Sequence, residues 1–172
     1  LGVLNSPALV SVAKDNGQAA ATLTENNIQQ MWSRMHPRSR MNAVWHINQD
    51  VEPQLYQLSR TIGTGGVPVY MQPGGLSASP FGVLYGRPVI PLEYSASVGT
   101  VGDITFVDWS QYLMADKNGV QAAQSMHIQF LTDQQAFRLI YRVDGKPGWH
   151  TALTPFKGSA TKSPYIALAT RA

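Results

Sequence analysis

Hydrophobic residues recur at helical spacing in the segment that follows Thr24. The residues that share this spacing are Ile28, Met31, Trp32 and Met35. Positions i, i+3, i+4 and i+7 lie on one face of a helix, and Thr24 is suited to cap its start. Pro37 disfavours helical backbone at the residue before it. The pattern therefore predicts a helix over about residues 25–35.

The pattern changes to alternation directly after this segment. Ala43, Trp45 and Ile47 alternate with Val44, His46 and Asn48, which is typical of a strand with a buried face. A second helix is expected next, with Asp50 as its cap and Pro53 in its first turn. Its apolar side would carry Leu55, Leu58 and Ile62, and the glycines at 63, 65 and 66 would end it.

Short strands and loops are predicted in the middle of the chain. Val67, Val69 and Met71 alternate before a loop rich in Pro, Gly and Ser over residues 73–80. A strand over residues 89–92 contains Pro91 and follows Pro88, so it should lie at an edge or a bulge. A further hydrophobic run over residues 104–107 follows the turn at Gly99 and Gly102.

The last third of the chain is strand-like. Alternating hydrophobic residues predict strands over residues 126–130 and 137–143, and Tyr165 to Leu168 form a terminal strand. The residues from Asp144 to Gly148 have the composition of a hairpin turn. We interpret residues 119–172 as a β-rich second unit.

Composition narrows the possible functions. Charged residues make up 13% of the 172 residues and the net charge is +3. A surface this poor in charge is either coated with neutral polar residues or covered by other subunits. The densest basic cluster is Arg34, Arg38 and Arg40, a short patch that is solvated or paired at an interface and too small to predict nucleic-acid binding. The chain has no Cys and no apolar run long enough to span a bilayer.

No catalytic or metal site can be nominated. The histidines at 36, 46, 127 and 150 lack the spacing of a helical metal site, and the GTGG run follows a helix where a phosphate loop would precede one. Asp103, Asp108 and Asp116 fit turn and cap roles better than acid and base roles. Trp32 and Trp45 are expected in the core, whereas Trp109 and Trp149 suit either the core or an interface. We therefore predict no cofactor, no metal and no enzymatic activity.

Five segments, in their order along the chain, resemble the tailed-bacteriophage major capsid protein family. They are LGVLN at 1–5, NAVWHINQD at 42–50, LYGRPVI at 84–90, VGDITFVDWSQY at 101–112 and FLTDQQAFRLIYRVDGKP at 130–147. The start at residue 1 lacks Met and is interpreted as a point inside a longer protein. The resemblance implies a mixed α/β, or α+β, capsid fold in which residues 1–118 form the apical domain at the capsomer axis. Residues 119–172 would be the C-terminal, β-rich part of the peripheral domain, without the family's N-terminal arm, extended loop and spine helix.

The resemblance also implies a function. The chain would be a structural subunit of an icosahedral phage or prophage head, assembled in the bacterial host cytoplasm as hexamers and pentamers around double-stranded DNA. Its partners would be copies of itself, the portal and a scaffold or protease, with only weak, non-specific contact to DNA and no membrane. Phe137, Leu139 or Ile140 would be exposed without the spine helix. Candidate interface residues are Pro73, Ser77, Pro80, Tyr94, Ser95, Gly99, Trp109, Arg138, Arg142 and Trp149.

Two alternatives stay open. An encapsulin-type bacterial compartment shares the capsid fold and encloses protein cargo in place of a genome. A small α/β enzyme or ligand-binding domain would also fit the alternating helices and strands of residues 20–110, although it lacks a catalytic set.

Overall fold

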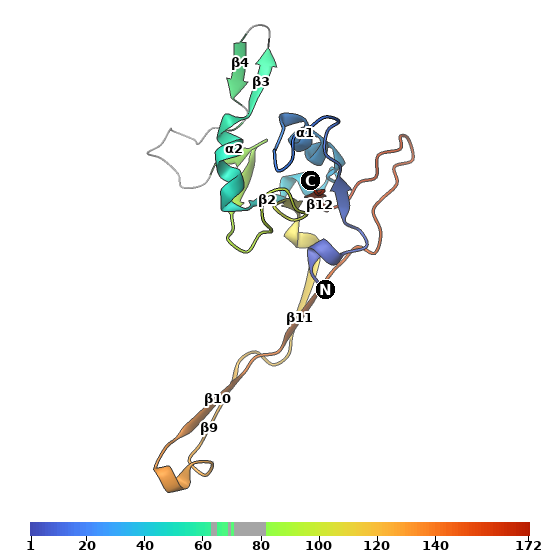
Figure 1. Cartoon of the computed structure of the whole chain (residues 1–172). Helices are drawn as coiled ribbons and strands as arrows, with labels where there is room; N and C mark the ends of the chain where they lie inside the picture. The colour runs from blue at the N-terminus through green and yellow to red at the C-terminus, as the bar shows by residue number, and fades with distance from the viewer. Residues whose placement is uncertain (63–64, 69, 71–81) are drawn as a thin grey trace.

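The chain folds into a body and a long two-stranded arm that projects from it (Figure 1). A computed structural model describes residues 1–172 except 63–64, 69 and 71–81. The body is built on a six-stranded sheet. In spatial order its strands are β1 (Val10–Val12), β12 (Tyr165–Leu168), β7 (Ile104–Val107), β2 (Val44–Ile47), β6 (Arg87–Pro91) and β5 (Val83–Leu84).

The sheet is mixed. β12 runs parallel to β1 and antiparallel to β7, while β2 runs antiparallel to β7 and parallel to β6. β5 pairs antiparallel with β6 through only two residue pairs. β6 therefore has a neighbour on each side, so the edge position expected from Pro88 and Pro91 was wrong, although β5 pairs only with the first two residues of β6.

Helix α1 (Glu25–Arg34) confirms the first predicted helix. The Thr24 hydroxyl accepts a hydrogen bond from the Asn27 amide, and the Asn27 side chain accepts one from the Thr24 amide, which makes a reciprocal cap. The helix ends when Met35 turns to extended backbone (ψ 133°), two residues before Pro37. Ile28 and Met31, on the predicted face, are fully buried.

The main core lies between one face of the sheet and the helices. At its centre the rings of Trp45 and Phe106 stack with centroids 4.0 Å apart. Burial of each large apolar side chain stabilises the fold by roughly 1.5–3 kcal/mol. The other members that are fully buried include Ile28, Met31, Met35, Ile47, Val51, Leu55, Ile104, Ile166 and Leu168.

A smaller hydrophobic cluster packs on the opposite face of the sheet. It contains Val3 of the 3-10 turn η1 (Val3–Asn5), Ala8, Val107 and Tyr165, with Trp149 packed against it. Both faces of β7 and β12 are thus covered, which explains why all four residues of β12 are buried.

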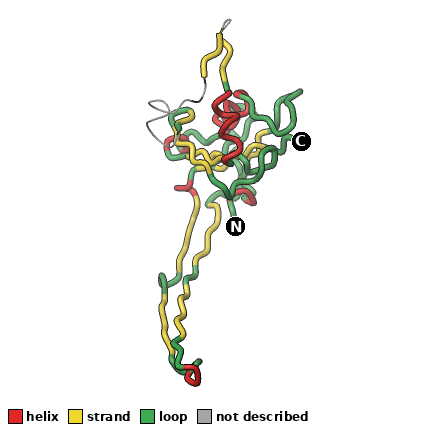
Figure 2. The backbone as a smooth tube through the Cα atoms, turned by 60° about the vertical axis from the view of Figure 1, so that its left-hand side comes forward, coloured by secondary structure: helices red, strands yellow, loops and turns green. Residues whose placement is uncertain are grey.

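The arm comprises residues 112–147. β8 (Tyr112–Asp116) pairs antiparallel with β11 (Val143–Pro147), and β9 (Gln121–Ser125) pairs antiparallel with β10 (Ala136–Ile140). The tip contains the 3-10 turn η6 (Phe130–Thr132). At about 3.3 Å per residue, the arm reaches on the order of 45 Å from the body. Figures 1 and 2 show that it contacts the body only at its base.

The second predicted helix is shorter than expected. Asn48, and not Asp50, accepts the capping hydrogen bond, at the start of η3 (Gln49–Val51), and α2 (Glu52–Gln57) follows directly. Residues that were expected to continue the helix form β3 (Ser59–Ile62), which pairs with β4 (Gly65–Pro68). The β-branched residues Thr61 and Ile62 favour strand over helix, so the prediction was wrong for this turn.

Two further predictions were wrong in the arm. Residues 126–130 were expected to form a strand but lie in the bends of the tip, because β9 ends at Ser125. The expected hairpin turn from Asp144 to Gly148 is instead mostly strand β11, in which Gly145 pairs with Met114. Cε1 of the Tyr112 ring lies 2.6 Å from the position that a Cβ on residue 145 would occupy. Glycine at this position therefore leaves room for the aromatic ring.

The C-terminal segment returns to the body. Residues 119–147 belong to the arm, whereas β12 lies between β1 and β7 in the central sheet. The body is therefore completed by residues from both sides of the expected boundary at 118. Which part lies at a capsomer axis and which at its periphery stays a prediction.

Candidate subunit interface

The arm leaves most of its large apolar side chains exposed. Leu131 at the tip is 98% exposed, and Phe137 and Leu139 in β10 are 73% and 74% exposed. The other exposed members are Leu113, Met114, Val120, Met126, Ile128, Phe130, Tyr141 and Val143. Exposed apolar side chains gathered on one projecting element mark sites of interaction with other polypeptides, and a two-stranded ribbon is marginally stable alone.

The alternation along β10 gives the arm two different faces. Phe137 and Leu139 pair with Gln124 and Ala122 of β9, whereas Arg138 pairs with Ala123 and points to the opposite face. The expected exposure of Phe137 and Leu139 is confirmed. Arg142 lies outside the strand, between β10 and β11, where its carbonyl accepts a hydrogen bond from the Lys117 amide.

Gln111 fixes the base of the arm to the body. It ends the turn η5 (Trp109–Gln111), which Asp108 caps by accepting a hydrogen bond from the Ser110 amide. The Gln111 carbonyl accepts hydrogen bonds from the Gly148 amide at 2.9 Å and the Tyr165 hydroxyl at 2.6 Å. Both strands of the arm are thereby joined to β12 at one point.

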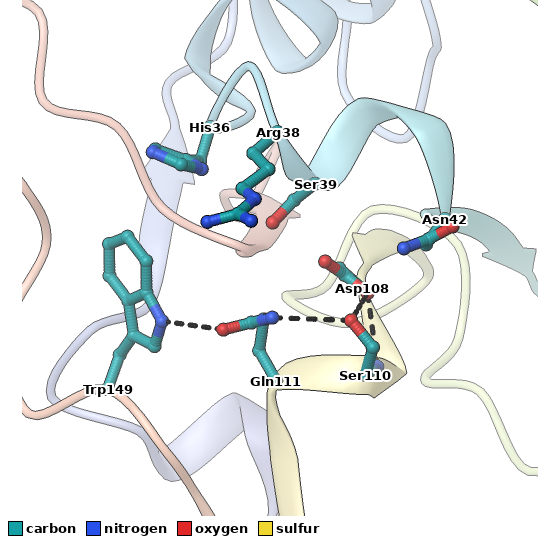
Figure 3. Close-up of a pocket in the computed structure, with 8 residues that line it drawn as sticks. All are labelled: His36, Arg38, Ser39, Asn42, Asp108, Ser110, Gln111 and Trp149. Carbon is teal, nitrogen blue, oxygen red and sulfur yellow. Dashed lines mark hydrogen bonds between the residues drawn. The ribbon is translucent and has the colours of Figure 1, made fainter.

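A polar pocket of about 200 Å³ lies beside this base (Figure 3). One wall is a chain of hydrogen bonds in which Trp149 donates to Gln111, Gln111 to Ser110, and Ser110 to Asp108. The other wall consists of His36, Arg38, Ser39 and Asn42. The guanidinium of Arg38 makes no hydrogen bond or ion pair within the part of the chain that the structure describes, and it reaches into the pocket.

An apolar hollow of about 380 Å³ opens on the sheet face opposite the main core. His46 and Trp109 lie in its lining, and the Trp109 indole N–H donates to Nε2 of His46 at 2.7 Å. Nδ1 of His46 is buried and has no partner among the described residues. Burial lowers the pKa of His46 from its ordinary value of 6.5, because desolvation disfavours the charged imidazolium.

The corner that follows β6 presents Tyr94 to solvent. Tyr94 is 95% exposed, and Asn48 holds the corner by donating to the carbonyls of Ser95 and Ala96. Gly99, in contrast, is buried. Its amide donates to Asp103 and its carbonyl accepts from the Arg171 amide, so it shapes the corner from inside.

The candidate interface residues are spread over three regions of the described structure. Tyr94 and Ser95 lie on the corner after β6, Trp109 and Trp149 lie at the arm base, and Arg138 and Arg142 lie on the arm. Trp109 is 47% exposed, whereas Trp149 is half-buried against the smaller cluster. Pro73, Ser77 and Pro80 lie outside the described residues. The role of each residue in an interface stays a prediction.

Sequence reasoning missed the ion pair of Asp103 with Arg171 and the pocket around Arg38. Asp103 and Arg171 are 68 residues apart and both fully buried, and no local pattern links them. Arg38 was recognised only as part of a basic patch. The pocket forms because the arm base and the segment before β2 meet in the fold.

Neither a cluster of potential metal ligands nor a membrane-spanning helix is found among the described residues. Outside residues 63–64, 69 and 71–81, no three His, Cys, Asp or Glu side chains cluster as metal ligands would. Within the same ranges no helix has the length and apolar character to cross a membrane.

Comparisons with known proteins agree with the resemblance seen in the sequence. The model of the Phage capsid family matches residues 1–158. No curated protein matches the chain. The fold is similar to a chain of the capsid of an empty GTA particle computed with C5 symmetry, with a TM-score of 0.63, 16% identity and coverage of 98% of this chain and 56% of that chain. The capsid of a native GTA particle computed with C5 symmetry gives a TM-score of 0.61, 15% identity and coverage of 95% and 50%.

The chain therefore spans about half the length of these solved relatives. The family match covers most of the chain, and the similarity in fold extends over the body and the arm together. The chain has the mixed α/β fold of tailed-phage capsid proteins and belongs to the phage capsid family.

Proposed function

We propose that this chain is the body-and-arm portion of a subunit that builds an icosahedral phage or prophage head from hexamers and pentamers around double-stranded DNA. The observation that carries the proposal is the arm, whose apolar side chains are exposed in a chain of the phage capsid family. A body with a complete core has no need of such an arm for its own folding.

Covering the arm supplies a driving force for assembly. Each large apolar side chain removed from water contributes roughly 1.5–3 kcal/mol. Association loses translational and rotational freedom and orders side chains, so only part of this gain appears as affinity. The surfaces that cover the arm are other segments of the same full-length protein and neighbouring copies of it.

Repetition of one head-to-tail contact by rotation closes a ring, and a ring is the unit from which a shell is tiled. We place residues 1–118 at the capsomer axis and assign residues 119–172 to the periphery, with β12 returning to the body. The chain itself has no catalytic role in this proposal. Its partners are copies of itself, the portal and a scaffold or protease, in a virion assembled in the host cytoplasm.

Contact with DNA is weak in this proposal. The net charge is only +3, and sequence-independent binders neutralise on the order of six to ten phosphates with clustered basic side chains. The shell would confine the DNA without reading its sequence.

Expression of the full-length protein with electron microscopy of the product tests the proposal. We expect closed spherical particles that sediment far faster than the subunit and, when produced with the rest of the phage genes, protect DNA from nuclease. Particles that contain protein cargo and no DNA would indicate the encapsulin-type alternative. A product that forms no particles would contradict a shell function.

A further inference from the structure

Two polar features of the body lie at opposite ends of strand β2. Arg38 and Asn42 precede the strand, and the pocket that they line opens at its start. Asn48 follows the strand and holds the corner that contains Glu93 and Tyr94, while the Leu92 amide donates to the Ile47 carbonyl at 2.7 Å. Each feature is therefore fixed to the same rigid strand, at its two ends.

The first feature presents a cation that has no partner. The Arg38 guanidinium reaches into the pocket without a hydrogen bond or ion pair in the described part of the chain, and the Asn42 amide lies at the pocket's rim (Figure 3). Asp108 on the far wall accepts hydrogen bonds from the Ser110 amide at 3.0 Å and hydroxyl at 2.6 Å, so Oδ1 is occupied. A guanidinium binds a carboxylate through two parallel hydrogen bonds, so a carboxylate that approaches on the Arg38 side, away from Asp108, is the group that this cation would bind.

The second feature presents a carboxylate beside an aromatic ring. Glu93 is exposed and makes no ion pair or hydrogen bond with any other residue that the structure describes. The neighbouring Tyr94 is 95% exposed, an unusual position for a large aromatic side chain on a free surface. Tyr and Arg are enriched among the residues that dominate binding energy at interfaces.

Closed rings need two different surfaces on one subunit, because each copy uses its first surface against the second surface of its neighbour. The Arg38 pocket and the Glu93 corner are two different surfaces at the two ends of β2, and they carry opposite charges. We infer that Glu93 of one copy enters the pocket of the next copy and pairs with Arg38, while Tyr94 packs against the pocket rim. The inference rests on the proposed shell function and names the contact that closes the ring.

A charge swap in the full-length protein tests the pairing. Arg38→Glu and Glu93→Arg should each lower the yield of particles at fixed protein concentration by more than about tenfold, since like charges are then opposed at every contact in the ring. The double variant Arg38→Glu with Glu93→Arg should restore particles. Because Glu93 is exposed and unpaired within the described chain, the melting temperature of the unassembled Glu93→Arg subunit should equal that of wild type. The melting temperature of Arg38→Glu is measured beside its particle yield, because the new carboxylate shares the pocket with Asp108.

Asp50 supplies a matched control. It is also exposed and also follows β2, so Asp50→Arg adds the same charge change at the same end of the strand. The combination of Arg38→Glu with Asp50→Arg should fail to restore particles. Equal rescue by Asp50→Arg, failure of the Glu93 swap, or normal assembly of both single variants would overturn the pairing while the shell function stands. A wild-type protein that forms no particles would overturn both.

Discussion

The guanidinium of Arg171 and the carboxylate of Asp103 form an ion pair in which neither side chain is exposed. The carboxylate also accepts hydrogen bonds from the amides of Gly99 at 2.9 Å and Ile104 at 2.8 Å. The pair therefore joins the segment after β12 to the corner that leads into β7. Such a pair adds little over an apolar replacement, but loss of one partner leaves a buried charge uncompensated.

Arg171→Met should consequently reduce the free energy of unfolding by about 3–5 kcal/mol. Chemical denaturation monitored by tryptophan fluorescence measures the change. Lys157→Met is the control, because Lys157 is exposed and should change stability by less than about 0.5 kcal/mol. A loss below about 1 kcal/mol for Arg171→Met would contradict the role given to the pair.

His46 should make the stability of the body depend on pH. Burial lowers its pKa in the folded protein below 6.5, so the unfolded chain takes up this proton at a higher pH than the folded chain does. The contribution of neutral His46 is therefore complete above about pH 6.5 and is lost as the pH falls below that value. Protonation would also remove the acceptor for the Trp109 indole N–H.

Unfolding free energies of wild type and His46→Gln at pH 7 and pH 5 check this expectation. Wild type should lose more stability than the variant over this interval. His127→Gln, which changes an exposed histidine of the arm, should behave as wild type. Parallel pH profiles for wild type and His46→Gln would exclude a contribution from His46.

We expect Gly99 to contribute to the stability of the fold and not only to contacts between copies. Its φ of +90° is unfavourable for residues with a side chain, and a Cβ would lie 3.1 Å from the Cα of Ala21. Gly99→Ala should destabilise the protein by roughly 1–3 kcal/mol. Gly17→Ala, at φ +74° with no atom within 4 Å, separates the backbone strain from the steric contact and should cost less. Impaired assembly of Gly99→Ala at unchanged unfolding free energy would indicate a contact role instead.

We expect the apolar face of the arm to be needed for assembly and not for the stability of the body. The double variant Phe137→Ser and Leu139→Ser in the full-length protein should remove most of the hydrophobic stabilisation that covering these side chains gives. This stabilisation is roughly 1.5–3 kcal/mol for each residue of each arm that is covered in the shell. We expect few or no particles by electron microscopy. Ala123→Ser, on the opposite face of the ribbon, is the control and should assemble normally. Normal assembly of the double variant would show that this face is not covered in the shell.

Local chemistry explains which elements could be predicted from the sequence. α1 and β2 have a regular hydrophobic period together with a capping Thr or a following polar residue, and both appear within a residue or two of their expected bounds. The terminal strand was predicted from Tyr165 to Leu168 and is β12. Period and caps are properties of a short segment, so they can be read without the rest of the fold.

Features that depend on distant residues could not be predicted in this way. The strand that contains Asp144 and Gly145 forms because β8 pairs with it, and this pairing overrides the preference of the local sequence for a turn. The Arg38 pocket and the His46–Trp109 hydrogen bond likewise join residues far apart in the chain. The resemblance to capsid proteins predicted the exposed face of β10 because it implied that a covering element lies elsewhere.

Electron cryomicroscopy of particles made by the full-length protein tests the central claim most directly. We expect a closed shell with fivefold and sixfold capsomers, in which Phe137, Leu139 and Leu131 of every arm are covered by other segments or copies. Particles of this kind would show that the arm is an assembly surface. Discrete small oligomers under all conditions, with the apolar faces of the arm open to solvent, would contradict the account.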